Sequence, residues 1–334
     1  MQELQLAGID VSARQLLVQV RNPQGAIQQL DLPNTEAGHR QLCKLLTQRG
    51  RRARACLEST GTYSLDIALA LAGHPGIELM IVNPRAARDF AKAFLHRSKT
   101  DAVDALVLLE FVQRMPFQPW QPPSPERLQL RALARRIGSL TQMSVEEKNR
   151  LHATEFGQPL HKDVRKDIQA HLRQLQRRLE KLEESAVDLI WANPELRQAL
   201  LHLTSIKGIG RLSAILILAE LCVLPGDMTD RQWVAHAGLD PKHHESGSSV
   251  HKPQRISRTG NPRLRSALYM PALSAAQHEP NVRAYYQKLL ARGKLPMQAL
   301  VAVMRKLLHS IHAMLRDRVD FDGQKFFAVE TPTS

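Results

Sequence analysis

Two aspartates stand three residues apart where an apolar helix is expected to begin. Ser98 or Thr100 can cap the N-terminus of this helix, so that Asp101 and Asp104 project from one face of its first turn. Two carboxylates on one face can hold a divalent metal ion. Two acids at a helix start can also simply complement the helix dipole, so the surrounding sequence has to decide between these readings.

Two further acids follow apolar segments upstream. Asp10 and Glu58 each come directly after a short run expected to form a strand. In an α/β sheet, such strand ends can face the start of the acidic helix, and four carboxylates would then converge. They could bind two Mg²⁺ ions about 3.5–4 Å apart, which suits phosphodiester chemistry. Arg97 and Lys99 would suit the incoming phosphate. Taken singly, Asp10 could be a turn residue and Glu58 a helix cap.

The elements that would position these acids follow an α/β order. Apolar alternation and turn residues predict three antiparallel strands, after which helices and strands alternate. This order is that of a ribonuclease-H-like α/β domain, which we expect over residues 1–114. The expected strands are 4–9, 15–21, 27–32, 53–57 and 78–82, and the expected helices are 35–48, 63–72, 88–95 and one from residue 100.

A proline-rich segment, residues 115–127, has the composition of a stiff, extended linker. Beyond it, apolar residues within 128–192 recur at spacings of three and four, which is the heptad pattern of coiled-coil helices. A break around Gly157 would separate two long helices. They could pack together as a hairpin or pair with another subunit. Arginines on the exposed face are usually only solvated, though they could follow a nucleic-acid backbone.

Residues 195–319 are expected to form a mostly helical C-terminal domain, followed by an uninformative tail, 320–334. Lys207, Gly208 and Gly210 lie in a turn typical of a helix-hairpin-helix, where glycines let backbone N–H groups reach a phosphate. A tight interhelical turn that binds nothing would have the same sequence.

A glycine-flanked serine cluster, Ser246, Ser248 and Ser249, follows in the same region. Such a cluster is usually a flexible polar loop. A serine hydroxyl can nevertheless attack a phosphodiester if a metal or base activates it and the phosphate is clamped. The surrounding cations that could form the clamp are Lys252, Arg255, Arg258, Arg263 and Arg265.

The composition favours a polyanionic partner. The chain of 334 residues has 46 Lys and Arg against 32 Asp and Glu, a formal net charge of +14, which suits nucleic acid. No apolar run is long enough to span a membrane, and the N-terminus does not have the pattern of a secretion signal. The three cysteines are isolated, which argues against disulfides and a thiolate zinc site. We therefore expect a reduced, cytoplasmic protein.

Short motifs recur in order along the chain. They are GIDVS at 8–12, ESTGTY at 58–63, NP at 83–84, SKTDAVDA at 98–105, GIG at 208–210, AGLxP at 237–241, ESGSS at 245–249, GNxxLR at 260–265 and MRKLL at 304–308. In these motifs the chain resembles the insertion-sequence 110 family, DEDD-type transposases related to the Piv DNA invertases. The likeness covers nearly the whole chain, with one departure: members often have proline where this chain has Lys207.

The resemblance implies an RNA-guided recombinase with a RuvC-like N-terminal domain, a coiled coil used in assembly and a C-terminal transposase domain. It places the metal-binding tetrad on Asp10, Glu58, Asp101 and Asp104, with Mg²⁺ as cofactor and Mn²⁺ as a substitute. It places the nucleophile on Ser246, which would form a covalent phosphoserine link to DNA while the tetrad of a partner subunit completes the site.

The same resemblance implies the partners of the chain. A bridge RNA made by the element would pair with target DNA and donor DNA. The protein would act as a dimer or tetramer assembled through the coiled coil, in the bacterial cytoplasm at the nucleoid.

Three other functions fit part of the sequence. A RuvC-like junction nuclease would use the same carboxylates with water as the nucleophile. An actin-like sugar kinase would share the GIDVS loop, although that loop usually needs glycine where Ser12 stands, and no second phosphate loop is found. A purely structural coiled-coil nucleic-acid binder would leave the four acids unexplained.

Overall fold

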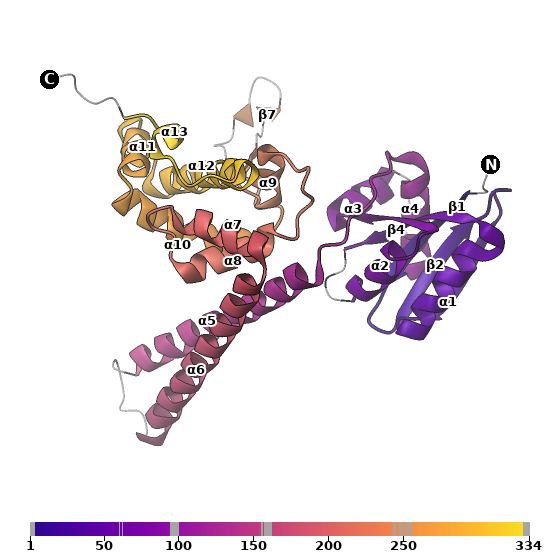
Figure 1. The fold of residues 1–334 in the computed structure, drawn as a ribbon, viewed down its shortest axis with the longest axis horizontal. Coiled ribbons are helices and arrows are strands. Elements are labelled where there is room, and N and C mark those ends of the chain that lie inside the picture. The colour runs from indigo at the N-terminus through magenta and orange to yellow at the C-terminus, as the bar shows by residue number, and fades with distance from the viewer. Residues whose placement is uncertain are drawn as a thin grey trace. The chain divides into compact units, whose positions relative to one another are not determined.

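The computed structural model describes residues 4–59, 61, 63–93, 100–154, 156, 162–242, 245–246, 250–251 and 255–329, without the side chains of 245, 246, 250 and 251. The chain divides into two compact units, Met1–Pro122 and Pro123–Ser334 (Figure 1). The first unit is mixed α/β, and the second is mostly helical, as the sequence predicts. In the described part, every helix is too short or too polar to cross a bilayer.

A five-stranded sheet forms the centre of the first unit. Its strand order is β3-β2-β1-β4-β5, with β1, β2 and β3 antiparallel and β1, β4 and β5 parallel. Each expected strand is confirmed to within two residues. The strands are β1 Leu4–Val11, β2 Gln15–Arg21, β3 Ile27–Pro33, β4 Arg52–Glu58 and β5 Ile77–Val82.

Helices cover both faces of this sheet (Figure 1). One buried cluster joins α1 and α2 to side chains such as Ile9 and Leu57, and a second joins α3 and α4 to Cys56 and Met80 on the opposite face. The helices are α1 Glu36–Thr47, α2 Leu65–Ala72, α3 Pro84–Ala93 and α4 Asp101–Arg114, with a short 3-10 turn, η1 Gln48–Gly50, after α1.

The close packing of α4 on β1 depends on Gly8. A Cβ at this position would lie 2.1 Å from the backbone oxygen of Ala105 and 2.2 Å from the nitrogen of Leu109. Only glycine lets the backbones of strand and helix come this close. Gly8 therefore sets the distance between the end of β1 and the start of α4.

The first half of the proline-rich segment packs on the first unit. The Trp120 N–H donates to Leu79 O at 2.6 Å, and the Arg54 guanidinium lies 4.6 Å from the centre of the Phe117 ring. The next helix begins at Pro125, with the Ser124 side chain as its N-cap.

The second unit begins with two long helices, α5 Pro125–Ala153 and α6 Lys162–Ala192, which pack along each other as a hairpin within one chain (Figure 1). Ile137, Leu140, Leu175 and Ala186 of the heptad pattern are buried. The expected break around Gly157 lies outside the described residues. The N-terminal part of α5 and the C-terminal part of α6 share one hydrophobic core with the helices that follow.

Those following helices complete the second unit, and in the described part four two-residue strands lie between α9 and α10 in the chain. The helices are α7 Pro194–Thr204, α8 Arg211–Leu221, α9 Asp230–His236, α10 Pro262–His278, α11 Pro280–Ala291, α12 Pro296–Asp317 and α13 Gly323–Phe326, and the strands are β6 Pro241–Lys242, β7 Glu245–Ser246, β8 Val250–His251 and β9 Arg255–Ile256.

Candidate active site

The sheet places two acids at one edge and on one face. Ile9 of β1 pairs with Leu57 of β4, so that Asp10 and Glu58 follow at the same level of the sheet. Side chains alternate between the faces of a strand, and Gly8 and Cys56, two residues earlier in each strand, face the side covered by α4. Asp10 and Glu58 therefore belong to the α4 face.

Helix α4 brings the other two acids to this edge. Thr100 is its N-cap, with Oγ1 accepting from the Val103 N–H at 3.3 Å, while the alternative cap, Ser98, lies outside the described residues. Asp101 and Asp104 both lie in the first turn of the helix. The close contact of α4 with β1 then fixes how far this turn lies from Asp10.

The electrostatics of Asp10 show that the four acids are close enough to interact. Burial, followed by the negative charges of Asp101, Asp104 and Glu58, raises the pKa of Asp10 from 3.8 to about 6, although a hydrogen bond from the Val11 backbone opposes this. Like charges disfavour one another's ionised form, so this edge of the sheet has an excess of negative charge. A divalent cation would relieve that excess.

The donor set fits a hard divalent cation. All four candidates are carboxylates, the ligands that Mg²⁺ and Mn²⁺ prefer. Among the described side chains, no three or more His, Cys, Asp or Glu are already arranged to hold a metal ion. Two properties of these acids favour a cation: their ligand chemistry and the mutual repulsion at Asp10, which a bound cation would convert to attraction.

An ion pair that sequence reasoning missed ties α4 to the sheet. Glu110 accepts from Arg21 Nη2 at 2.6 Å and from Arg114 Nε at 2.8 Å. Burial raises the pKa of Glu110, but the bonds from both arginines outweigh it and lower that pKa overall. This contact holds α4 against β2, two turns beyond the acids. Nothing in the sequence pairs Arg21 with Glu110, because 89 positions separate them.

The cations expected beside the acids, Arg97 and Lys99, lie outside the described residues. Their contact with a phosphate stays a prediction.

The interhelical turn before α8 requires glycine at position 208 because of its backbone conformation and packing. Gly208 has φ +109°, and a Cβ there would lie 2.4 Å from the backbone nitrogen of Ala275 in α10. Gly210 is the N-cap of α8 and has open space at its Cβ position, and Lys207 is exposed. Packing alone thus explains Gly208, whereas Lys207 and Gly210 remain accessible to a phosphate.

The segment that contains Ser246 is a hairpin closed at its base. Ser246 pairs with Val250, and further toward the base Lys242 pairs with Arg255. The Ser257 N–H donates to Asp240 O at 2.8 Å, and the Ser257 hydroxyl contacts the Asp240 carboxylate. The Ser246 side chain and residues Ser248, Ser249 and Lys252 lie outside the described part.

The predicted arginine clamp divides into two kinds of residue. Arg255, Arg258 and Arg263 are exposed. Arg265 is half-buried, and its Nη1 donates to Ala237 O at 2.7 Å. Arg265 thus supports the turn before the hairpin, and the three exposed arginines are better placed to meet a phosphate.

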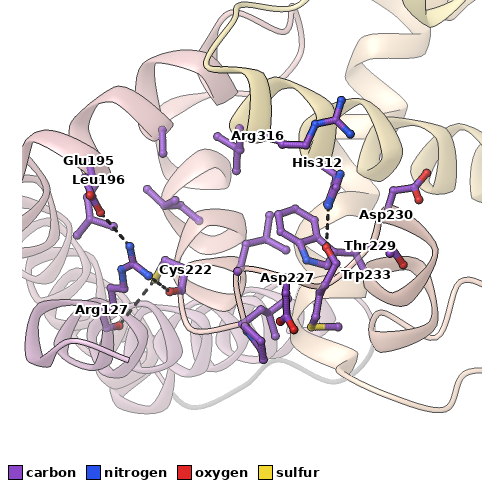
Figure 2. A pocket seen from close by; sticks show the side chains of 18 residues that line it. Arg127, Glu195, Leu196, Cys222, Asp227, Thr229, Asp230, Trp233, His312 and Arg316 are labelled. Carbon is purple, nitrogen blue, oxygen red and sulfur yellow. Dashed lines mark hydrogen bonds and ion pairs between the residues drawn. The ribbon is translucent and has the colours of Figure 1, made fainter. Parts of the chain in front are cut away.

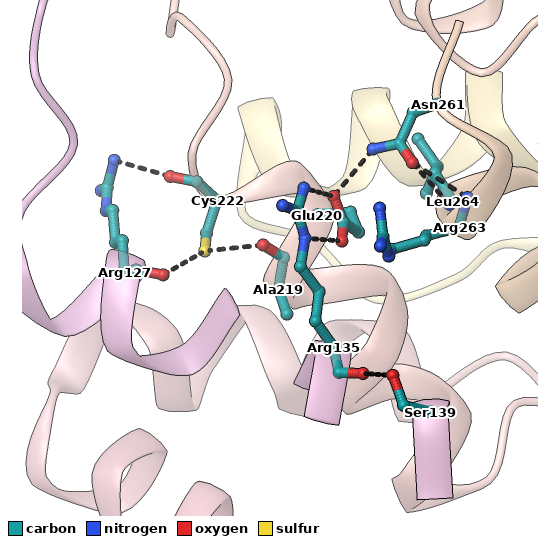
Figure 3. A network of polar contacts seen from close by, with 9 residues as sticks. All are labelled: Arg127, Arg135, Ser139, Ala219, Glu220, Cys222, Asn261, Arg263 and Leu264. Carbon is teal, nitrogen blue, oxygen red and sulfur yellow. Dashed lines mark hydrogen bonds and ion pairs between the residues drawn. The ribbon is translucent and has the colours of Figure 1, made fainter. Parts of the chain in front are cut away.

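A buried polar network holds the segment between the serine hairpin and α10 in place (Figure 3). Glu220 is 4% exposed and accepts from Arg135 at 2.9 and 3.1 Å and from Asn261 Nδ2 at 2.7 Å. Burial raises the pKa of Glu220, but these bonds outweigh it and lower the pKa. The Asn261 Oδ1 accepts from the Arg263 and Leu264 N–H groups and so caps α10. Sequence reasoning missed Glu220, although a lone acid in an apolar helix indicates a buried partner.

A separate cavity of about 570 Å³ lies in the second unit (Figure 2). Trp233 lines it, and the buried Nε1 of Trp233 has no hydrogen-bond partner among the described residues. Arg127 bonds Glu195 and the Cys222 carbonyl, and His312 bonds Met228 O at 2.9 Å. The Arg127 and His312 side chains are thus engaged with neighbours in the chain, and we place the candidate site at the four carboxylates instead.

Two family models match the sequence. A model described as "Transposase" matches residues 7–154, which contain the four acids. A model described as "Transposase IS116/IS110/IS902 family" matches residues 192–287, which contain the interhelical turn and the serine hairpin.

Curated relatives are similar over much of the chain. The pilin gene-inverting protein of Moraxella bovis is 32% identical over 272 residues, which cover 80% of this chain and 81% of that protein. The putative transposase y4rJ of Sinorhizobium fredii is 28% identical over 287 residues, covering 69% and 70% of the two chains. The insertion element IS110 uncharacterized 43.6 kDa protein of Streptomyces coelicolor is 36% identical over 132 residues, covering 38% and 31%.

Proposed function

The chain belongs to the insertion-sequence 110 family of DNA transposases, and we propose that it cuts and rejoins DNA through a covalent phosphoserine link at Ser246. In this proposal, Asp10, Glu58, Asp101 and Asp104 hold the divalent cations that the reaction requires. The observation that carries the metal site is the raised pKa of Asp10, to which the other three acids all contribute.

We further propose that the first unit has a ribonuclease-H-like, RuvC-like fold. The strand order β3-β2-β1-β4-β5, with three antiparallel strands followed by two parallel ones, supports this assignment. In it, the acids at the ends of β1 and β4 and at the start of α4 form one site.

The reaction would exchange one phosphate ester for another. A bound Mg²⁺ or Mn²⁺ would polarise the phosphate and stabilise the charge on the attacking and leaving oxygens. The Ser246 Oγ forms a bond to phosphorus as one bond from phosphorus to a deoxyribose oxygen breaks. The serine proton passes to a base, and the departing deoxyribose oxygen takes up a proton. Attack by a hydroxyl of the second DNA on the phosphoserine then joins the new ends and frees Ser246.

Residues of the second unit would hold the DNA during these steps. Arg255, Arg258 and Arg263 are exposed around the serine hairpin and would neutralise backbone phosphates. Lys207 and the backbone at Gly208 and Gly210 would contact phosphate without reading sequence.

The proposed partners are target DNA, donor DNA and a bridge RNA that pairs with both. The net charge of +14 supports contacts with several nucleic-acid strands. We also propose a dimer or tetramer in which the tetrad of one subunit acts with Ser246 of another. Leu172 and Leu179 of α6 are only half-buried in the single chain, which leaves apolar surface for a coiled-coil contact with a second copy.

The test is a search for a protein–DNA adduct that survives denaturation. Purified protein, Mg²⁺, the flanking non-coding RNA and labelled target and donor DNA are incubated and resolved on a denaturing gel. We expect an adduct with the wild type, Ser248→Ala and Ser249→Ala, and none with Ser246→Ala, which should still bind nucleic acid. Metal-dependent cleavage without any adduct would indicate instead a nuclease that uses water, and strand exchange by Ser246→Ala would refute the serine mechanism.

A further inference from the structure

The side chain of Asn34 joins two loops that border the carboxylates. Its Nδ2 group donates to Ser12 O at 2.8 Å and to Tyr63 O at 3.1 Å. Its Oδ1 contacts His39 Nε2 at 2.8 Å. The backbone N–H of Asn34 also donates to Arg14 O at 2.9 Å. All the polar atoms of one amide are therefore engaged in holding separate parts of the chain together.

The two loops follow the strands that present the acids. Ser12 comes two residues after Asp10 and one after the end of β1, and Tyr63 follows β4, which ends at Glu58. Asn34 stands between β3 and α1 and reaches both. The paired residues of β1 and β4 end at Ile9 and Leu57. After that point, the Asn34 side-chain amide directly connects the segment that follows Asp10 to the segment that follows Glu58.

His39 fixes the orientation of this amide. It lies in the first turn of α1 and is only 6% exposed. Burial lowers the pKa of His39, although the charges of Asp66 and Glu36 oppose this, and this shift favours the neutral ring. The two carbonyls can only accept hydrogen bonds, so the amide must turn its NH₂ group toward them and its oxygen toward His39. His39 Nε2 is then the donor.

We propose that Asn34 is a positioning residue that sets the spacing between the Asp10 and Glu58 carboxylates and thereby the affinity of this edge for a divalent cation. The inference rests on the proposed metal site. Partners outside the ligand shell commonly change metal affinity by roughly 10- to 100-fold, because they hold the ligands in place.

Two substitutions test this role, and a second asparagine controls for them. Asn34→Ala removes all three contacts. Asn34→Asp keeps an acceptor for His39 but removes both donors. Asn22 lies in the β2–β3 turn, at the other end of the sheet, where its Oδ1 accepts from the Ala26 N–H at 2.8 Å. Asn22→Ala and Asn22→Asp therefore make the same chemical changes away from the acids.

The measurement is Mn²⁺ binding to the full-length protein by calorimetry, without nucleic acid, alongside the melting temperature without metal. We expect both Asn34 variants to bind Mn²⁺ roughly 10-fold more weakly than the wild type, and both Asn22 variants to bind it normally. The Asp variant is the sharper test, because its added negative charge would by itself strengthen cation binding. If Asn34→Ala does not fold, Asn34→Asp carries the test.

Wild-type Mn²⁺ affinity in a folded Asn34→Asp protein would overturn the inference, even if its melting temperature fell. The Asp104→Asn variant tests separately whether the four carboxylates bind the metal at all. If that variant binds Mn²⁺ as the wild type does, the carboxylates are not the metal site, whatever the Asn34 variants do.

Discussion

Replacing Gly8 with alanine should disable the carboxylate site by moving α4. The new Cβ would lie 2.1 Å from Ala105 O, whereas real Cβ contacts stay above about 3.0 Å, so strand and helix must separate by roughly 0.9 Å. The opposing atoms belong to the backbone of α4 and cannot rotate away. Overpacking of this kind costs about 1–3 kcal/mol in the free energy of unfolding.

The functional effect should exceed the loss of stability. A shift of 1 Å in catalytic groups can cost about 100-fold in rate, and here it would move Asp101 and Asp104 away from Asp10. Hydrogen exchange of the β1 amides would report the local stability, and Mn²⁺ calorimetry would report the site.

A matched control is available in α5. Gly138→Ala makes the same substitution where the new Cβ meets open space, and should stabilise the helix by about 0.5–1 kcal/mol with no effect on Mn²⁺ binding. If Gly8→Ala showed wild-type β1 protection and wild-type Mn²⁺ affinity, the argument that Gly8 sets the strand-to-helix distance would be wrong.

Two further predictions concern charge. Because the pKa of Asp10 is raised to about 6 in the folded protein, its contribution to metal-free stability is fully present below about pH 3.8 and is lost as pH rises through 6. Asp10→Asn should remove this part of the pH dependence of the free energy of unfolding, measured in urea. The Mn²⁺ affinity of the wild type should fall as pH drops below 6, because protons compete with the metal for the carboxylate. Arg263→Ala should weaken DNA binding and reduce the slope of log affinity against log salt concentration by about 1, while leaving the free energy of unfolding within about 0.5 kcal/mol. Arg265→Ala should instead cost about 1 kcal/mol of stability, because the hydrogen bond to Ala237 O is lost. Equal stability of the two variants in thermal unfolding would contradict this difference between Arg263 and Arg265.

The sheet and the placement of two acids could be predicted from the sequence because both follow from local patterns. Alternating apolar residues and turn residues mark each strand, and the period of two then fixes which side chains share a face. Asp10 and Glu58 lie at the carboxyl ends of neighbouring parallel strands, so their meeting follows once the strand order is known. The start of α4 was equally local, because Thr100 provides the cap.

Contacts between distant segments could not be predicted in this way. Gly8 gives no sign in the sequence that a helix backbone will lie against it, and the partners of Asn34 come from three different segments. Glu220 could have been recognised as a buried acid in an apolar helix, but its partner Arg135 lies 85 residues away. The heptads predicted two long helices without deciding their partner, and the structure packs them on each other.

The measurement that tests the carboxylate site most directly is anomalous diffraction from crystals of the full-length protein soaked in Mn²⁺. We predict manganese density coordinated by oxygens of Asp10, Glu58, Asp101 and Asp104, and its loss in crystals of Asp104→Asn. Manganese bound elsewhere, or equally well in the Asp104→Asn crystals, would contradict the assignment of these four acids as the metal site.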